Sequence, residues 1–131
     1  MLIVEDDCDI SIMLEQIMLM DGHEVRVGHN GEDGMRLVDE DKPDIVILDI
    51  EMPVLSGPGI VLRMFAHNCG FEKIPIILMS GHVDLDGIAK EVGTPYKLAK
   101  PFQIEELFSL VQRVSREKIF PRPPSNEVSA T

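Results

Sequence analysis

The polar side chains best placed to do chemistry each follow a short apolar run of the sequence. They are Glu5, Asp6, Asp49, Ser80 and Lys100. Apolar runs bounded by chain breakers are typical of strands buried on both faces of a parallel sheet. The carboxyl ends of parallel strands meet at one edge of the sheet, which is where open α/β sheets bind ligands. We therefore expect these residues to converge on one pocket, although they extend from position 5 to position 100.

Glu5, Asp6 and Asp49 would bring three carboxylates into that pocket. At a separation of about 4 Å and an effective dielectric constant near 20, each pair of charges costs about 4 kcal/mol. Protonation with a raised pKa would relieve the repulsion. A hard divalent cation would relieve it better, because carboxylates, a backbone carbonyl and water are the ligands that Mg²⁺ takes. The acids therefore predict a Mg²⁺ site.

The elements that must position these residues can be read from the apolar pattern. The central one lies in the segment 43–57, where the run 45–48 ends on Asp49 and a turn containing proline and glycine follows. Strands are expected at 1–4, 24–28, 45–48, 76–79 and 96–99. Helices are expected from an Asp9 cap to Asp21-Gly22, from an Asn30 cap to 38, and over 56–68, 85–92 and 104–114. Because strand and helix alternate five times, the pattern predicts a doubly wound α/β domain with helices on both faces of a parallel sheet.

Length and composition limit the classes of protein. The chain has 131 residues, 44% of them hydrophobic, which suits one domain with its own core. A net charge of -11 argues against direct nucleic-acid binding, and two cysteines are too few for a disulfide framework. No apolar segment is long enough to span a membrane, so a soluble, cytoplasmic protein is expected. Residues 1–116 should form the domain, and the Pro-rich stretch 117–131 should be a disordered tail.

In combination, the strand-end motifs resemble the receiver domains of two-component response regulators, the CheY-like superfamily. The similarity covers roughly residues 1–116. The motifs that carry it are Leu2-Ile3-Val4-Glu5-Asp6, Ile47-Leu48-Asp49-Ile50-Glu51-Met52-Pro53, Ser80-Gly81 and Lys100-Pro101-Phe102. The resemblance implies a flavodoxin-like (βα)5 domain whose five-stranded parallel sheet has the order 2-1-3-4-5.

The resemblance also implies roles for individual residues. Asp49 would receive a phosphoryl group from a histidine kinase or a histidine phosphotransfer protein. Asp6, Asp49 and the backbone carbonyl of Glu51 would ligate Mg²⁺, and Glu5 would act largely through water. Lys100 would pair with the phosphoryl oxygens. Ser80 would hydrogen-bond one of them and shift an equilibrium between two states of the domain.

Further features concern regulation and partners. His82 and the side chain of Glu51 are expected to tune the lifetime of the phosphoryl group, and the Lys100-Pro101 bond is expected to be cis. Many family members carry a switching aromatic residue where this chain has Lys97, with Tyr96 one position earlier, so the usual aromatic coupling is not expected to carry over unchanged. The face made by the fourth helix, last strand and fifth helix would meet an output partner or a second copy.

The predicted function is a phosphorylation-dependent signalling switch of a two-component system or phosphorelay. The chain would be a phosphoacceptor that assists its own phosphorylation and dephosphorylation rather than an enzyme. One alternative is a docking module of receiver type that is not phosphorylated. A more distant alternative is a phosphatase of the haloacid dehalogenase type. The sequence Asp7-Cys8-Asp9 loosely resembles the paired aspartates of that family, but Ile10-Ser11 does not continue the pattern.

Overall fold

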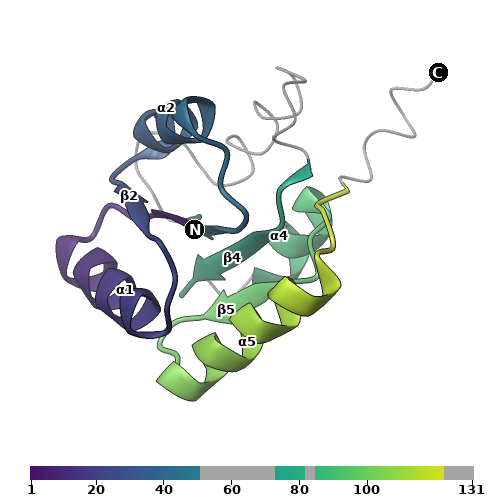
Figure 1. Ribbon diagram of the computed structural model, residues 1–131. Coiled ribbons are helices and arrows are strands. Elements are labelled where there is room, and N and C mark those ends of the chain that lie inside the picture. Colours follow the sequence, from purple (N-terminus) through teal and green to yellow (C-terminus); the bar gives the residue numbers. More distant parts are fainter. Residues whose placement is uncertain (51–72, 82–84, 123–131) are drawn as a thin grey trace.

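The chain folds around one sheet, seen in a computed structural model that describes residues 1–50, 73–81 and 85–122 (Figure 1). The strands are β1 Leu2–Val4, β2 Arg26–Gly28, β3 Val46–Asp49, β4 Ile76–Ser80 and β5 Lys97–Ala99. The helices are α1 Cys8–Met20, α2 Gly31–Glu40, α4 Leu85–Val92 and α5 Ile104–Glu117. The helix predicted over 56–68 lies outside the described residues, as do Glu51 and His82.

The five strands are all parallel and lie in the order β2-β1-β3-β4-β5. This confirms the predicted α/β fold and its strand order. In the register of the sheet, Val4 of β1 lies beside Leu48 of β3, and Ser80 of β4 lies beside Ala99 of β5. The carboxyl ends of β1, β3, β4 and β5 therefore reach the same edge together.

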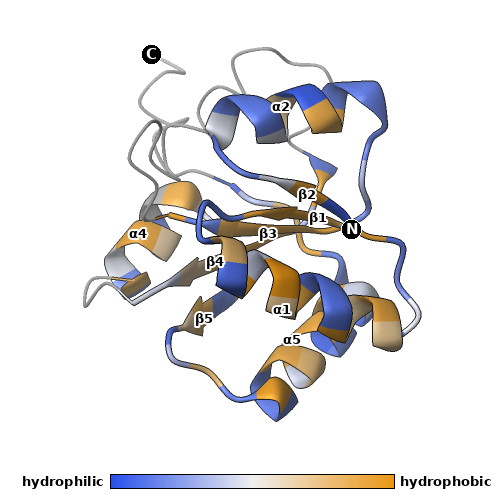
Figure 2. Cartoon of the chain, turned by 90° about the vertical axis from the view of Figure 1, so that its left-hand side faces the viewer, coloured by the Kyte–Doolittle hydropathy of each residue, from blue (hydrophilic) through white to orange (hydrophobic). Residues whose placement is uncertain are grey.

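Two apolar layers explain why the central strands contain almost no polar residues. Figure 2 shows α1 and α5 on one side of the sheet and α2 on the other. Side chains of β1, β3 and β4 alternate between these layers: Leu2 and Val4 pack with α2 and α4, whereas Ile3 packs with α1 and α5. Each of these positions is buried, so an apolar residue is favoured at every one of them.

In the described part of the chain, no helix is long and apolar enough to cross a membrane.

The helix caps follow the sequence with one correction. Asp7, not the predicted Asp9, caps α1, because its Oδ1 accepts a hydrogen bond from the amide of Ile10 at 3.1 Å and Asp9 already lies in the first turn. The predicted end of α1 is confirmed, with Gly22 in the left-handed region at φ 90°. The predicted Asn30 cap of α2 is also confirmed.

A glycine allows α2 to lie close to the sheet. A Cβ added to Gly34 would lie 2.8 Å from Cγ2 of Val4, which is shorter than van der Waals contact. The glycine therefore costs some helix propensity but permits this approach, which brings α2 against the strand that precedes Glu5.

The described part of the chain stays packed on the domain past the predicted boundary at residue 116. Glu117 is the last residue of α5, and the chain that follows it is held against the domain. The amide of Ile119 donates to the hydroxyl of Tyr96 at 3.2 Å, and the amide of Arg122 donates to the carbonyl of Gly93 at 2.8 Å. These acceptors order the segment as far as residue 122. For residues 123–131, which lie outside the described ranges, the tail stays a prediction.

Candidate functional site

The five residues singled out in the sequence all lie at the carboxyl edge of the sheet. Asp49 is the last residue of β3 and Ser80 the last of β4, while Glu5 follows β1 and Lys100 follows β5. The backbone ladder continues through the residues beyond the strands: the amide of Glu5 donates to Gly28 at 3.0 Å, and the amide of Lys100 donates to Ser80 at 2.9 Å. The edge is therefore a hydrogen-bonded frame that fixes where each side chain starts.

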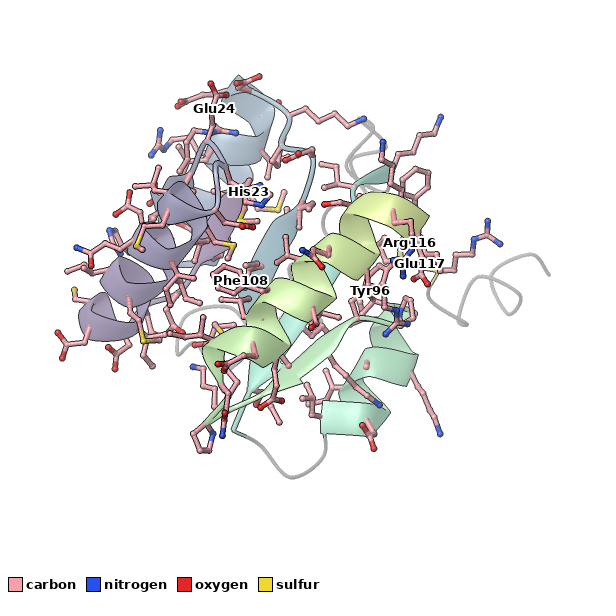
Figure 3. The ribbon with its side chains drawn as sticks, turned by 60° about the horizontal axis from the view of Figure 1, so that its bottom comes forward. His23, Glu24, Tyr96, Phe108, Arg116 and Glu117 are labelled. Carbon is pink, nitrogen blue, oxygen red and sulfur yellow. The ribbon has the colours of Figure 1, made fainter. Side chains whose placement is uncertain are left out.

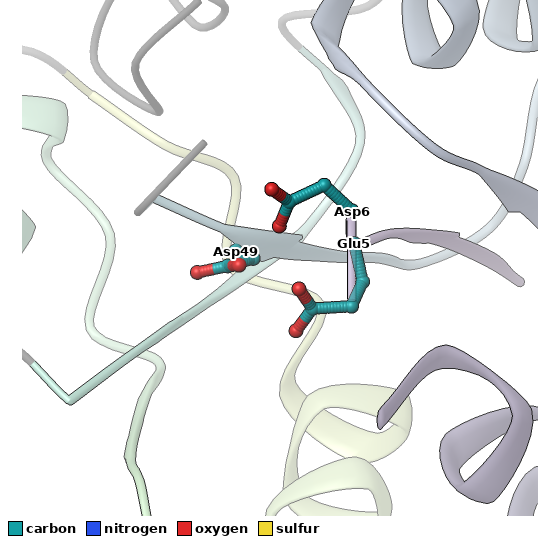
Figure 4. Close-up of side chains that lie close together, drawn as sticks. All are labelled: Glu5, Asp6 and Asp49. Atoms are coloured by element: carbon teal, nitrogen blue, oxygen red, sulfur yellow. The ribbon is translucent and has the colours of Figure 1, made fainter. Parts of the chain in front are cut away.

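The three acids meet as predicted. One carboxylate oxygen of each of Glu5, Asp6 and Asp49 lies within 4.8 Å of the others (Figure 4). Glu5 is 0% exposed and Asp49 2% exposed, whereas Asp6 is open to solvent. The cluster is thus a pocket with two buried carboxylates and one at its mouth.

Lys100 brings a positive charge into this pocket. Its Nζ lies 3.0 Å from Oε1 of Glu5 and 3.4 Å from Oδ2 of Asp49. The Lys100-Pro101 bond is cis, as predicted. The sequence did not predict that the ammonium pairs with Glu5 as well as with Asp49. If all four groups were ionised, three negative charges and one positive charge would leave two uncompensated negative charges.

Burial and the neighbouring groups both shift the pKa values in this pocket. Burial and, after it, the hydrogen bond with Asp49 raise the pKa of the Glu5 carboxyl from its ordinary 4.5 to about 7, although the Lys100 ammonium and the amide of Asp7 act to lower it. Burial alone would lower the pKa of Lys100. The hydrogen bond to Glu5 and the charge of Asp49 outweigh burial, so the pKa of Lys100 is raised. Without a metal ion, Glu5 therefore keeps its proton to a higher pH than an exposed glutamate does.

The donor set fits a hard divalent cation. Among the described residues it offers three carboxylates, whose oxygens are ligands that such a cation takes, against the single ammonium of Lys100. Glu5, Asp6 and Asp49 are the described residues that could hold such an ion.

The remaining predicted positions are partly described. Ser80 is buried at the end of β4, beside Lys100 along the edge. His82 and Glu51 lie outside the described residues, so their predicted roles stay predictions. Lys97 is exposed and forms an ion pair with Asp86 of α4, whereas Tyr96 is buried against α5.

Two features of the site were not found in the sequence. The amide of Asp7 donates to Oε2 of Glu5 at 3.1 Å, so the residue that caps α1 also fixes the buried carboxylate. A hollow of about 430 Å³ adjoins Lys100 and is lined otherwise by the apolar residues Ile10, Met13, Pro101 and Phe102. The first uses a backbone amide, which every residue except proline has, so the residue type carried no signal for it. The second depends on how α1 meets the chain after β5.

Comparisons with known proteins agree with this arrangement. The family model described as response regulator receiver domain matches residues 1–112. The transcriptional regulatory protein PrrA of Mycobacterium tuberculosis is 32% identical over 119 residues, which are 89% of this chain and 50% of that protein. Sporulation initiation phosphotransferase F of Bacillus subtilis is 33% identical over 114 residues, 86% of this chain and 90% of that protein.

A solved structure extends the similarity to the fold. A putative response regulator from Chloroflexus aurantiacus superposes with a TM-score of 0.81 at 30% identity, covering 88% of this chain and 96% of the other. The chain spans about half the length of PrrA but most of the length of the other two proteins.

Proposed function

The chain belongs to the response regulator receiver domain family, and on that premise we propose that it is a phosphorylation-dependent signalling switch with Asp49 as its phosphoacceptor. The observation that carries the proposal is the meeting of Glu5, Asp6, Asp49 and Lys100 at one edge of the sheet. A buried nucleophilic carboxylate beside a fixed ammonium and two further acids suits phosphoryl transfer, which needs positioning and charge neutralisation more than covalent assistance.

In the proposed reaction, a carboxylate oxygen of Asp49 forms a bond to the phosphorus atom of a phosphohistidine. The bond from phosphorus to the histidine nitrogen breaks, and the nitrogen keeps the electron pair. The product on this chain is an aspartyl phosphate. The burial of Asp49 keeps bulk water away from the acceptor and strengthens every charge interaction around it.

Each neighbouring side chain has a part in this proposal. Lys100, already 3.4 Å from Asp49, compensates charge on the transferred oxygens, and the hydroxyl of Ser80 donates a hydrogen bond to one of them. Glu5, Asp6 and Asp49 would hold Mg²⁺, with the backbone carbonyl of Glu51 as a further proposed ligand. When bound, this ion supplies charge neutralisation for the phosphoryl oxygens.

A histidine kinase or a histidine phosphotransfer protein is the proposed phosphoryl donor. Such a protein must cover the mouth of the pocket, and α1 begins directly beside it at Cys8. The outer face of α1 exposes Ile12, Met13, Leu19 and Met20, and Met13 also lines the apolar hollow next to Lys100. We assign this apolar face to docking of the donor protein. The face formed by α4, β5 and α5 is left for an output partner or a second copy.

Intact-mass measurement tests the proposal most simply. The full chain is incubated with acetyl phosphate, with Mg²⁺ or with a chelator, and compared with Asp49→Asn and with Met13→Gln. We expect one added phosphoryl group that is labile at alkaline pH, absent with the chelator and absent in Asp49→Asn. Met13→Gln should be phosphorylated normally, because a small donor does not need the α1 face.

Measurements of partner binding and of phosphate-ester turnover on the same variants, with Asp7→Asn added, separate the alternatives. No phosphoryl group with any donor, together with partner binding unaffected by Asp49→Asn, would favour a docking module that is not phosphorylated. Turnover of a phosphate ester that is lost in Asp7→Asn and kept in Asp49→Asn would favour a phosphatase. Asp7 instead caps α1 through Ile10, which is a structural role.

A further inference from the structure

The segment that follows α5 is fixed to the domain at two points. Lys118 ends α5 in the left-handed region at φ 53°, which turns the chain away from the helix axis. The amide of Ile119 then donates to the hydroxyl of Tyr96 at 3.2 Å, and the amide of Arg122 donates to the carbonyl of Gly93 at 2.8 Å. Pro121, between these bonds, is buried. We call residues 118–122 the strap.

The hydroxyl of Tyr96 holds the strap and is both a hydrogen-bond acceptor and a hydrogen-bond donor. The side chain is 0% exposed, and while it accepts from Ile119 it donates to Oε1 of Glu117 at 3.1 Å (Figure 3). The same oxygen accepts from Nε of Arg113 at 3.1 Å, and the guanidinium of Arg113 lies 5.2 Å from the centre of the tyrosine ring. The last turn of α5 and the strap are therefore joined at one buried phenol.

The other partner of the strap is the connection between α4 and β5, residues 93–96. The amide of Gly93 donates to Ala89 of α4 at 2.8 Å. The hydroxyl of Thr94 donates to Ile76 of β4 at 2.7 Å and accepts from the amide of Tyr96 at 3.2 Å. The connection is thus bonded to a helix and a strand on one side and to the strap on the other.

The connection and the candidate site occupy the two ends of β5. The strand runs Lys97–Ala99, with Tyr96 before it and Lys100 after it. At about 3.3 Å per residue, the two side chains start about 13 Å apart along one strand. Lys97, between them, is paired with Asp86 of α4. A displacement of α4 and β5 would therefore act directly on the Gly93 carbonyl and the Tyr96 hydroxyl, which accept the two hydrogen bonds from the strap.

We propose that the strap is a conformational device that couples the end of α5 to the α4–β5 connection. A displacement of that connection releases the strap, and by thermodynamic reciprocity a release of the strap loosens the connection. This inference goes beyond the proposed function and does not depend on phosphorylation of Asp49.

Hydrogen exchange of single amides, followed by NMR on the full chain, tests the coupling. Tyr96→Phe removes the hydroxyl but keeps the buried ring and its contact with Arg113. Arg122→Pro removes the amide that donates to Gly93 at a position where the sequence already has a proline on either side, and the matched control Arg122→Ala keeps that amide. The amide of Val46, bonded to Pro75 in the centre of the sheet, reports global stability.

If the strap is coupled, the loss of one of its hydrogen bonds should speed amide exchange at the other. We expect Tyr96→Phe to speed exchange of the Arg122 amide, and Arg122→Pro to speed exchange of the Ile119, Gly93 and Thr94 amides, by about two- to tenfold. Arg122→Ala should leave these amides unchanged, and in the other two variants the acceleration at the strap and the connection should exceed any change at the Val46 amide. The inference is wrong if Tyr96→Phe speeds exchange only of the Ile119 amide, which loses its acceptor. It is also wrong if the Gly93 and Thr94 amides are insensitive to Arg122→Pro, because the two bonds of the strap are then independent.

Discussion

Replacement of Glu5 by glutamine should remove a specific pH dependence of stability. In the absence of divalent cations, the pKa of the folded-state Glu5 carboxyl is about 7 and its ordinary value is 4.5. Between these values the folded chain binds more protons than the unfolded chain, so the free energy of unfolding falls as pH rises. A difference of roughly 2.5 pKa units at 1.36 kcal/mol per unit gives a loss of about 3 kcal/mol across this range.

Urea unfolding in a chelator at several pH values between 4.5 and 7.5 measures this effect. The useful quantity is the difference in unfolding free energy between the wild type and Glu5→Gln, because the lowered pKa values of other acids, such as that of Asp44, cancel in it. As pH rises across this range, the unfolding free energy of the wild type should fall by about 3 kcal/mol relative to that of Glu5→Gln. Glu24→Gln, an exposed change of the same charge, should show no such shift. Parallel pH curves for wild type and Glu5→Gln would refute the assignment of a buried, proton-binding Glu5.

Three further substitutions test other parts of the account by chemical denaturation. Lys100→Met leaves two buried carboxylates without their ammonium, so it should lower the unfolding free energy in a chelator at pH 8 by about 3 kcal/mol, and a loss under about 1 kcal/mol would contradict the pairing. Gly34→Ala places a Cβ 2.8 Å from Val4, and overpacking of roughly 1–3 kcal/mol against a helix-propensity gain near 1 kcal/mol should leave a net loss of about 1 kcal/mol. In a chain that already carries Val4→Ala, Gly34→Ala should cause no further loss. Asn30→Ala should cost about 1 kcal/mol as a lost cap of α2 while Asn30→Ser costs far less, and equal losses would show that the cap is not the cause.

The meeting of the site residues was predictable because it depends on topology. Runs buried on both faces identify the strands, and parallel strands place their carboxyl ends together, so Glu5, Asp49 and Lys100 had to reach one edge once the alternation of strand and helix was recognised. The pairing of Lys100 with Glu5 was not predictable in the same way. It depends on side-chain directions across β1, β3 and β5, which strand assignment does not fix.

Local signals predicted some boundaries and not others. Asn30 was correctly identified as a cap because it is the only capping residue near the start of α2, whereas Asp6, Asp7 and Asp9 all precede or begin α1 and the sequence alone does not rank them. The choice of Asp7 follows from the amide it contacts.

The strap shows where composition misleads. It leads directly into Pro123 and Pro124, and a proline-rich stretch of this kind is typical of disorder. Tyr96 was predicted as a strand residue next to the usual switch position, not as a partner of the chain after α5. The structure orders the strap through acceptors on Tyr96 and Gly93, which lie more than twenty residues earlier in the chain. Contacts at this separation leave no periodic signal in the sequence.

Asp49, and no other acid in the pocket, is proposed to carry the phosphoryl group. Borohydride reduction of the phosphorylated chain converts an acyl phosphate to an alcohol, so peptide mass spectrometry then identifies the acceptor. We predict homoserine at position 49, formed only after incubation with both the phosphodonor and Mg²⁺. Reduction at Glu5 or Asp6 in place of Asp49, or a phosphoryl group that forms equally well without a divalent cation, would contradict the account.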